Sequence, residues 1–277
     1  MKRKYVHILS VLLFITIYAC GTGINLFSPQ DDVNLGLDVA RQIQNDPQEY
    51  PIFHGDPSIK KYIVDKIFNP ILASPKVTGK NVYPYSLEII DKPDVMNAFA
   101  LPGGYVYVYT GLLKYLDSDA ALAGSLAHEI AHAERRHSTQ RMTASYGTQF
   151  LLNMVLGSNP SQIAEITSNL FVGFAFLANS RSDENEADEY SFKYLQDTKF
   201  YPGGVKFFFE KMKKDNLVNS NSDGIKTFLS THPDPIDRIA STEERLKAAG
   251  LPVYSYDDDK PGIMHKEYRN NILNRLK

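Results

Sequence analysis

The pattern of apolar and polar positions divides the first third of the chain into short helices and strands. Apolar residues recur every three or four positions in residues 31–44, after an acidic start, and again in residues 57–72, where Pro57 stands in the first turn. Both segments therefore predict amphipathic helices. In residues 85–91 apolar and polar side chains alternate, which predicts a strand.

Residues 97–113, NAFALPGGYVYVYTGLL, predict a β-hairpin, because a Pro-Gly-Gly turn signal separates two extended runs. The second strand alternates tyrosine with valine, so the two residue types face opposite sides of the sheet. An extended peptide substrate could add to this strand through main-chain hydrogen bonds; the alternative is an ordinary buried strand. The residues that would bind the peptide are Tyr105, Val106, Tyr107 and Val108.

The second half of the chain predicts a more helical structure. Ser118 is a capping residue, and the small and apolar residues that follow it as far as His137 predict a tightly buried helix. The very apolar residues 146–177 predict a buried helical hairpin, with a membrane-touching or substrate-touching surface as the alternative. Three further helices are expected at residues 183–196, 202–215 and 235–249.

Length and composition favour one globular domain with appended segments. The chain has 277 residues, of which 43% are apolar and 22% charged, and its net charge is −2. We expect no nucleic-acid partner, because no basic, aromatic-rich stretch is present. The predicted organisation is a signal peptide at 1–20, a tether at 21–30, the folded domain at 31–250 and a tail at 251–277.

The N-terminus has the pattern of an export signal. Three basic residues precede an uncharged apolar run at 8–19, which is too short to span a bilayer comfortably. The sequence IYAC, ending at Cys20, resembles the cleavage box of bacterial lipoproteins, although Tyr18 is bulkier than usual there. The resemblance implies an exported protein anchored to a membrane through a lipidated Cys20 and facing the periplasm or cell exterior. A plain signal peptide or a short membrane anchor is the alternative.

The motif HEIAH carries the candidate chemistry. On a helix, His128 and His132 stack on one face, about 5.4 Å apart along the axis, and could both bind one zinc ion. Glu129 lies about 100° further round, where it could reach a water on the metal rather than the metal itself. The alternative is a helix whose histidines satisfy local hydrogen bonds.

A catalytic zinc needs a third protein ligand. In the predicted helix SRSDENEADEYS, Glu184 and Asp188 share one face, so one carboxylate could bind zinc while the other accepts the free N–H of a ligating histidine. Glu186 points away from that face, toward solvent. The alternative is an acidic helix start favoured by the macrodipole, which accounts for Glu184 but not for Asp188.

These segments together carry a family resemblance. HEIAH, SRSDENEAD, NAFALPGGYVYVYTGLL and STHPDPIDRI resemble the HtpX-like and CAAX-prenyl-protease-like zinc metallopeptidases of peptidase family 48, over residues 26–249. LFSPQDDVNLG further resembles the exported lipoprotein-type branch. The resemblance implies an α+β fold: a mostly helical zincin-type metallopeptidase domain with a small sheet preceding the HExxH active-site helix.

The resemblance also implies roles for individual residues. One zinc ion per chain would bind His128, His132 and Glu184, with Glu129 as general base and Asp188 supporting a ligand. The multi-spanning members of the family have transmembrane helices that this chain lacks, so we do not extend their prenylated-peptide substrates to it.

Two residues of THPDPIDR are candidates for the second donor to the tetrahedral oxyanion, beside the metal: His232 and Arg238. His232 could instead occupy the fourth position on zinc and silence the enzyme until its loop moves, or could merely fix the loop. Tyr190 is a weaker alternative donor. We expect His137 to stabilise the C-terminus of the active-site helix.

The sequence therefore predicts a zinc metalloendopeptidase of the bacterial cell envelope, which acts on protein or peptide substrates that are unfolded or misassembled. The alternative is a zinc-holding chaperone-like or latent module gated by the His232 loop. The presence of Glu129 argues against a pure binding module, which would not need a base beside the metal.

Overall fold

The computed structural model describes residues 25–144, 179–217, 228–232 and 235–276. The predicted signal peptide, Cys20 and the predicted helical hairpin lie outside these residues. The elements, in chain order, are α2 (Pro29–Asn45), α3 (Pro57–Ile63), η1 (Val64–Phe68), α4 (Asn69–Leu72), η2 (Gly79–Asn81), β1 (Ser86–Ile90), β2 (Ala98–Leu101), η3 (Pro102–Gly104), β3 (Tyr105–Tyr109), α5 (Thr110–Tyr115), α6 (Asp119–Glu134), α9 (Arg181–Leu195), α10 (Val205–Lys214), α12 (Pro235–Ala248), α13 (His265–Tyr268) and η4 (Arg269–Leu273).

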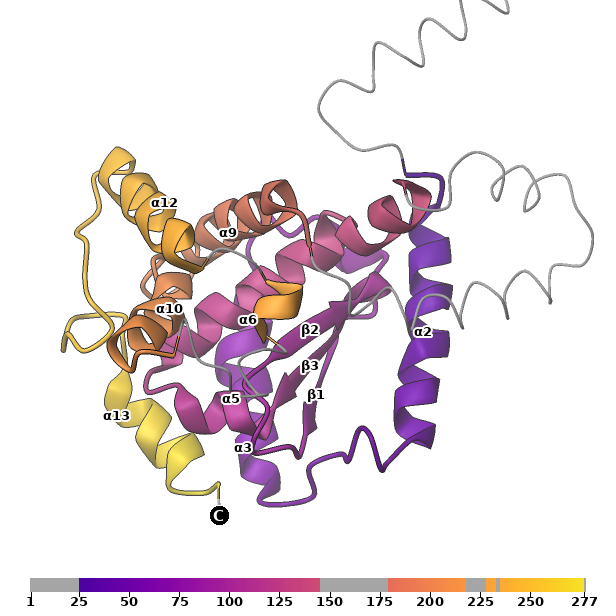
Figure 1. The fold of residues 1–277 in the computed structure, drawn as a ribbon, viewed down its shortest axis with the longest axis horizontal. Coiled ribbons are helices and arrows are strands. Elements are labelled where there is room, and N and C mark those ends of the chain that lie inside the picture. Colours follow the sequence, from indigo (N-terminus) through magenta and orange to yellow (C-terminus); the bar gives the residue numbers. More distant parts are fainter. Residues whose placement is uncertain (1–24, 145–178, 218–227, 233–234, 277) are drawn as a thin grey trace, which may run out of the picture.

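These elements confirm the predicted fold class, since helices dominate and a small sheet precedes the helix that carries HEIAH (Figure 1). The predicted helix at 57–72 is one continuous run of α3, η1 and α4. Among the described helices, none is both long and apolar enough to cross a membrane.

The three-stranded sheet has the order β1-β3-β2. β3 pairs with β1 in parallel and with β2 antiparallel, so both of its edges are occupied. The prediction that a peptide adds to Tyr105, Val106, Tyr107 and Val108 is therefore wrong, because the backbone hydrogen-bonding groups of a central strand already have partners. β2 pairs only with β3 within the described residues.

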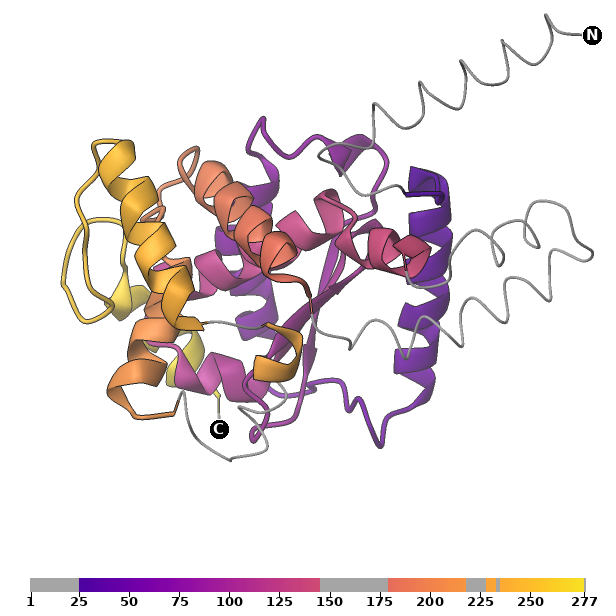
Figure 2. The same cartoon turned by 45° about the horizontal axis from the view of Figure 1, so that its top comes forward.

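The two faces of the sheet pack against different helices, as the alternation in β3 predicts. Val106 and Val108 belong to the main core with residues of α6, whereas Tyr107 and Tyr109 pack with residues of α2. In Figures 1 and 2, α2 flanks the sheet on one side while α6, α9, α10 and α12 lie on the other. The sheet thus forms one wall beside α6.

The small residues of α6 allow close helix packing. A Cβ atom on Gly124 would lie 2.2 Å from the backbone nitrogen of Val205, and one on Gly204 would lie 2.1 Å from the carbonyl oxygen of Ala120. The start of α10 therefore touches the backbone of α6 directly. The Oγ atom of Ser191, on α9, donates to the Gly124 carbonyl at 3.2 Å, which fixes α9 against the same helix.

α6 ends at Glu134, three residues earlier than the predicted His137. Arg136 follows with φ of 62°, a left-handed conformation that interrupts the helix before a new helical segment begins at His137. The Glu134 carboxylate also accepts hydrogen bonds from the backbone N–H groups of Thr78 and Gly79, both at 2.8 Å. These contacts hold the end of α6 against a neighbouring loop.

The folded part of the chain extends beyond the predicted boundaries at both ends. Asn25 donates to Thr139 at 2.9 Å, and α2 begins at Pro29, so part of the predicted tether is folded. In the predicted tail, Tyr268 and Ile272 are fully buried in the main core. Short apolar segments of this kind carry too little periodicity to be recognised in sequence.

Candidate metal centre and active site

The two histidines of HEIAH lie on the buried side of α6. His128 and His132 are one helical turn apart, and their Nε2 atoms are 2.9 Å from each other. Both side chains are almost fully buried. The helix therefore brings two imidazole nitrogens to one point inside the protein.

Glu184 reaches the same point from α9. A capping box formed by Ser180 and Asp183 starts this helix, so Glu184 lies in its first turn. The Glu184 carboxylate oxygens lie 3.4 Å from Nε2 of His128 and 3.2 Å from Nε2 of His132. The structure thus places this carboxylate directly beside the histidine pair.

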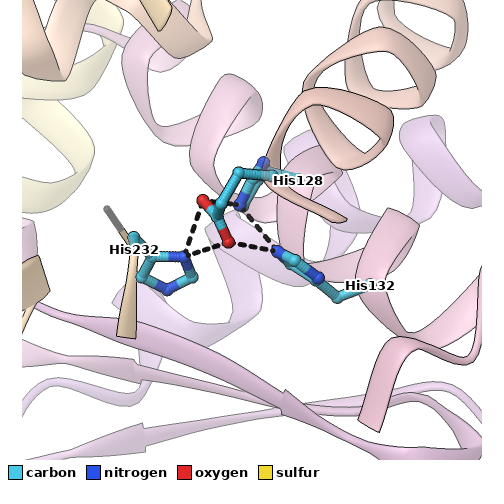
Figure 3. A group of neighbouring side chains, drawn as sticks. His128, His132 and His232 are labelled. Atoms are coloured by element: carbon cyan, nitrogen blue, oxygen red, sulfur yellow. Dashed lines mark hydrogen bonds and ion pairs between the residues drawn. The ribbon is translucent and has the colours of Figure 1, made fainter. Parts of the chain in front are cut away.

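His232 completes the cluster from the turn that precedes α12. Its Nδ1 atom is 3.2 Å from each oxygen of Glu184, and its ring stacks on Phe228 at a centroid distance of 4.9 Å. Figure 3 shows the three imidazole rings converging on this carboxylate. All four side chains are buried, and one possible ligand atom of each lies within 4.8 Å of the others.

The donor set fits a zinc ion. With zinc–donor bonds of about 2.0–2.1 Å, donors at the corners of a tetrahedron lie about 3.3 Å apart. Here the Nε2 atoms of His128 and His132 are 2.9 Å apart, and Glu184 lies 3.4 Å from the first through Oε2 and 3.2 Å from the second through Oε1. Two imidazoles and one carboxylate are also a donor combination that zinc prefers, with a fourth position left for another group.

Asp188 lies one turn beyond Glu184 and contacts the other ring nitrogen of His128. The Oδ1 atom of Asp188 is 2.9 Å from His128 Nδ1, the contact expected from the helical spacing. A carboxylate in this position keeps the proton on Nδ1, so the lone pair of Nε2 remains free to bind a metal.

Arg238 does not offer a free donor to a substrate oxyanion, contrary to the prediction from sequence. Its Nε and Nη2 atoms donate to Asp188 at 2.8 and 2.6 Å, and Nη1 donates to Glu184 at 2.7 Å. The guanidinium lies over the ring of Phe209, 4.4 Å from its centroid. Two buried carboxylates one turn apart need a cation, and Arg238 holds both in place.

Three side chains near the site were not assigned to it from the sequence. Asn179 donates to Glu184 at 2.6 Å, and its backbone N–H donates to the carbonyl of Thr231 at 3.1 Å, beside His232. Its position five residues before Glu184 gives no periodic signal, because it precedes the helix.

His137 and Glu186 are the other two. His137 contacts His132 rather than the end of the helix, and Glu186 accepts from His137 rather than lying free in solvent. The helix break at Arg136 turns His137 back toward the site, and a single sequence does not reveal a break of that kind.

Tyr190, the weaker alternative donor, lies under the guanidinium of Arg135, which is 4.6 Å from the centroid of the tyrosine ring.

Burial and the surrounding charges set the protonation of the carboxylates. Burial alone would raise the pKa of Glu184, but the charges of His232, Arg238 and His128 outweigh it and hold the pKa well below its usual range. Burial also opposes ionisation of Asp188, whose pKa is nevertheless lowered by Arg238 and His128. Both carboxylates are therefore ionised at neutral pH and available to bind cations.

The two histidines of α6 differ in protonation. Burial and the nearby charge of His128 lower the pKa of His132 well below its usual value, so its ring is neutral. Burial and the charge of Arg238 also tend to lower the pKa of His128. Glu184 and Asp188 outweigh both effects and raise this pKa to about 9. The carboxylates thus attract one positive charge to the position where a metal would lie.

Glu129 lies beside the cluster at the edge of a small cavity. The cavity has a volume of about 20 Å³ and is lined by His128, Glu129 and Ala98 together with the aromatic rings of Phe208 and Phe228, among others. Burial raises the pKa of the Glu129 carboxyl, which moves it toward the range of a general base at neutral pH.

A buried HExxH helix with a glutamate from a second helix defines a zinc metallopeptidase-type site. Residues 60–246 match the model of Peptidase family M48. This match covers more than half of the chain, and the chain belongs to that family of metalloendopeptidases. The resemblance to peptidase family 48 seen in the sequence is confirmed.

Named relatives include proteases of two kinds. The chain is 29% identical over 225 residues to the mitochondrial metalloendopeptidase OMA1 of Schizosaccharomyces pombe, which covers 79% of this chain and 64% of that protein. It is 29% identical over 175 residues to the beta-barrel assembly-enhancing protease of Escherichia coli, which covers 60% of this chain and 35% of that protein. The chain therefore spans less than two thirds of the length of these relatives.

Proposed function

We propose that this protein is a zinc-dependent endopeptidase in which His128, His132 and Glu184 hold the metal. The observation that carries the proposal is the convergence of two imidazoles and one carboxylate beside a further carboxylate, Glu129, which is buried and, in the part of the chain that the structure describes, forms no hydrogen bond with these three donors. A binding module would need the donors alone.

A zinc ion held by His128, His132 and Glu184 would supply Lewis-acid chemistry, which makes water more acidic and polarises a carbonyl group. The Glu129 carboxylate takes a proton from the attacking water and later passes it to the leaving amine nitrogen. Its raised pKa, caused by burial, suits both steps, because the group must accept and release a proton near neutral pH.

Within the described residues no strand pairs with the edge of β2 that faces away from β3, and this edge is the surface that best fits a peptide substrate. Asn97 and Tyr109 form a hydrogen-bonded pair, with Tyr109 N–H donating at 3.0 Å, so alternation directs the backbone of Ala98 and Ala100 away from β3. The Ala98 N–H already donates to Oδ1 of Asn97 at 3.0 Å, so Ala100 offers the N–H to a peptide. Ala98 also lines the cavity beside Glu129. A peptide that extends β2 would therefore pass the base.

The proposed location is the bacterial cell envelope, with a lipidated Cys20 as anchor. The basic start, the short apolar run and the cysteine that follows it support this location. Unfolded or misassembled envelope proteins are the proposed substrates, because main-chain pairing with β2 requires an extended segment and little side-chain specificity. The name of the E. coli relative supports an envelope role.

The proposal is tested by incubating the purified protein with casein before and after removal of its metal. We expect cleavage by the zinc-loaded protein, loss of cleavage with a chelator, and recovery when zinc is restored. Glu184→Gln is expected to lose both zinc and cleavage, whereas Glu189→Gln, on the exposed side of the same helix, keeps both. Cleavage that survives complete zinc removal would overturn the proposal.

A latent state gated by His232 is supported by one further observation. His232 lies within hydrogen-bonding distance of Glu184, and its Nε2 atom is 3.7 Å from Glu129. In this position its ring could take the fourth donor position beside the other members of the cluster. We expect His232→Ala to raise the rate of casein cleavage; an unchanged or lower rate at equal zinc content would favour a supporting role for His232 in catalysis.

A further inference from the structure

The ring of His132 begins a chain of polar contacts that leads from the metal centre to the protein surface. His132 Nδ1 is 2.8 Å from His137 Nδ1, and His137 Nε2 is 2.9 Å from Glu186 Oε2. The other Glu186 oxygen, Oε1, accepts from Arg135 Nε at 2.9 Å. The chain thus joins two imidazoles, a carboxylate and a guanidinium in sequence.

The geometry fixes the position of each proton along this chain. His132 turns Nε2 toward Glu184 and His128, so as a metal ligand it carries its proton on Nδ1. That N–H donates to His137 Nδ1, which must therefore be unprotonated. The proton of His137 then lies on Nε2 and is donated to Glu186. Each member thus depends on the next for its orientation.

The two histidines of α6 are consequently supported in different ways. His128 donates its Nδ1 proton directly to Asp188. In the described segments no carboxylate contacts Nδ1 of His132, which reaches Glu186 through the imidazole of His137. His137 is fully buried, so a side chain unable to accept a hydrogen bond there would leave the His132 N–H without a partner.

A break in the helix places His137 where it can serve this purpose. Arg136 adopts a left-handed conformation, which few residues other than glycine favour. Its guanidinium is held by Asp32, at 2.5 Å, and by the carbonyl oxygen of Phe27; Asp32 in turn accepts from Tyr83 at 2.7 Å. The N-terminal helix α2 therefore holds the turn that directs His137 back onto His132.

We propose that His137 and Glu186 are positioning residues, which hold His132 in the tautomer and orientation that bind the metal. The inference rests on the metal site of the proposed function but not on peptidase activity. It assigns a role to Glu186, whose side chain is 36% exposed and lies outside the donor cluster. Partners of ligating histidines typically change metal affinity by 10–100-fold when they are removed.

The test measures zinc affinity on the full chain in detergent, by competition with a coloured chelator. We expect His137→Phe and Glu186→Ala to weaken zinc binding about 10–100-fold. Glu186→Gln is expected to lose less, because its amide oxygen still accepts from His137. The matched control is Glu189→Ala, which removes from the same helix a half-exposed carboxylate that forms an ion pair with Lys193.

A second readout separates positioning from a general effect on folding. The visible spectrum of the cobalt-loaded protein reports the geometry around the metal, and we expect it to change in Glu186→Ala while the thermal midpoint of the metal-free protein stays within a few degrees of the parent. Should His137→Phe fail to fold, Glu186→Ala alone decides, because its side chain lies at the surface.

Zinc affinity within twofold of the parent in folded Glu186→Ala, with an unchanged cobalt spectrum, would overturn the inference. Equal weakening by Glu189→Ala would also overturn it, since the effect would then be one of general charge. A parent that binds zinc without cleaving casein would remove the proposed function and leave this inference standing. A parent that binds no zinc would remove both.

Discussion

The guanidinium of Arg238 meets the carboxylate of Asp188 through two hydrogen bonds, of 2.8 and 2.6 Å, inside the protein core. The same guanidinium donates to Glu184 at 2.7 Å. Arg238 therefore fixes two carboxylates of α9. These are Glu184, the third possible metal donor, and Asp188, the hydrogen-bond partner of His128. The metal centre depends on this arrangement before any metal binds.

Arg238→Met is expected to destabilise the metal-free protein by about 3–5 kcal/mol, because it leaves two buried carboxylates without their cation. Urea denaturation of the zinc-free protein measures this directly. The matched control is Arg41→Met, whose side chain is 63% exposed and pairs with Asp38 at the surface; it should change stability by less than about 0.5 kcal/mol. A loss below about 1 kcal/mol for Arg238→Met would contradict the structural role.

Asp119 at the start of α6 predicts a pH dependence of stability. Burial raises the pKa of this carboxyl to about 6, against the opposing effects of the Tyr62 hydroxyl and the Lys199 charge, while Glu267 adds to the increase. Because the folded pKa lies above the unfolded value, the group stabilises the fold at low pH. That stabilisation, about 3 kcal/mol, is lost as the pH rises from about 4 to 6.

The measurement compares Asp119→Asn with the parent by urea denaturation from pH 4 to 7. The asparagine keeps an acceptor for Tyr62, whose hydroxyl lies 2.6 Å from the carboxylate. The variant should therefore gain stability relative to the parent as the pH rises through this range. A difference between the two proteins that does not change with pH would show that Asp119 titrates as an exposed carboxyl does.

Ala100→Pro tests whether a peptide substrate pairs with the edge of β2 that faces away from β3. Proline removes one N–H from the edge directed away from β3, and the preceding residue is already extended, so the strand itself should persist. Loss of one main-chain hydrogen bond to a peptide corresponds to about 1 kcal/mol, or roughly a fivefold lower kcat/KM. Ala100→Ser keeps the N–H and should cleave as the parent does. Equal kcat/KM for the two variants would place the substrate elsewhere.

The sequence predicted the elements whose patterns are local. The spacing of HEIAH places its two histidines on one helical face, and the spacing of Glu184 and Asp188 does the same for α9. Each pattern depends only on helical geometry. The hairpin was likewise recognisable from its turn residues and from the alternation of tyrosine and valine.

Contacts that depend on the meeting of distant segments could not be predicted in this way. β3 is a central strand because residues 86–90 pair with it in parallel, and no local pattern reveals which strands become neighbours. The guanidinium of Arg238 was misassigned for the same reason, since its carboxylate partners lie about fifty residues earlier in the chain. The turn at Arg136 depends on Asp32, which lies 104 residues earlier in the chain.

The central claim is that Glu129 acts as the general base beside a zinc ion held by other residues. The most direct measurement is kcat/KM for casein cleavage by Glu129→Gln and by the parent at equal zinc content. We predict one zinc per chain in both proteins and a loss of about 10²–10⁴-fold in the variant, because glutamine cannot accept the proton from water. Cleavage by a zinc-loaded Glu129→Gln at the rate of the parent would contradict this account.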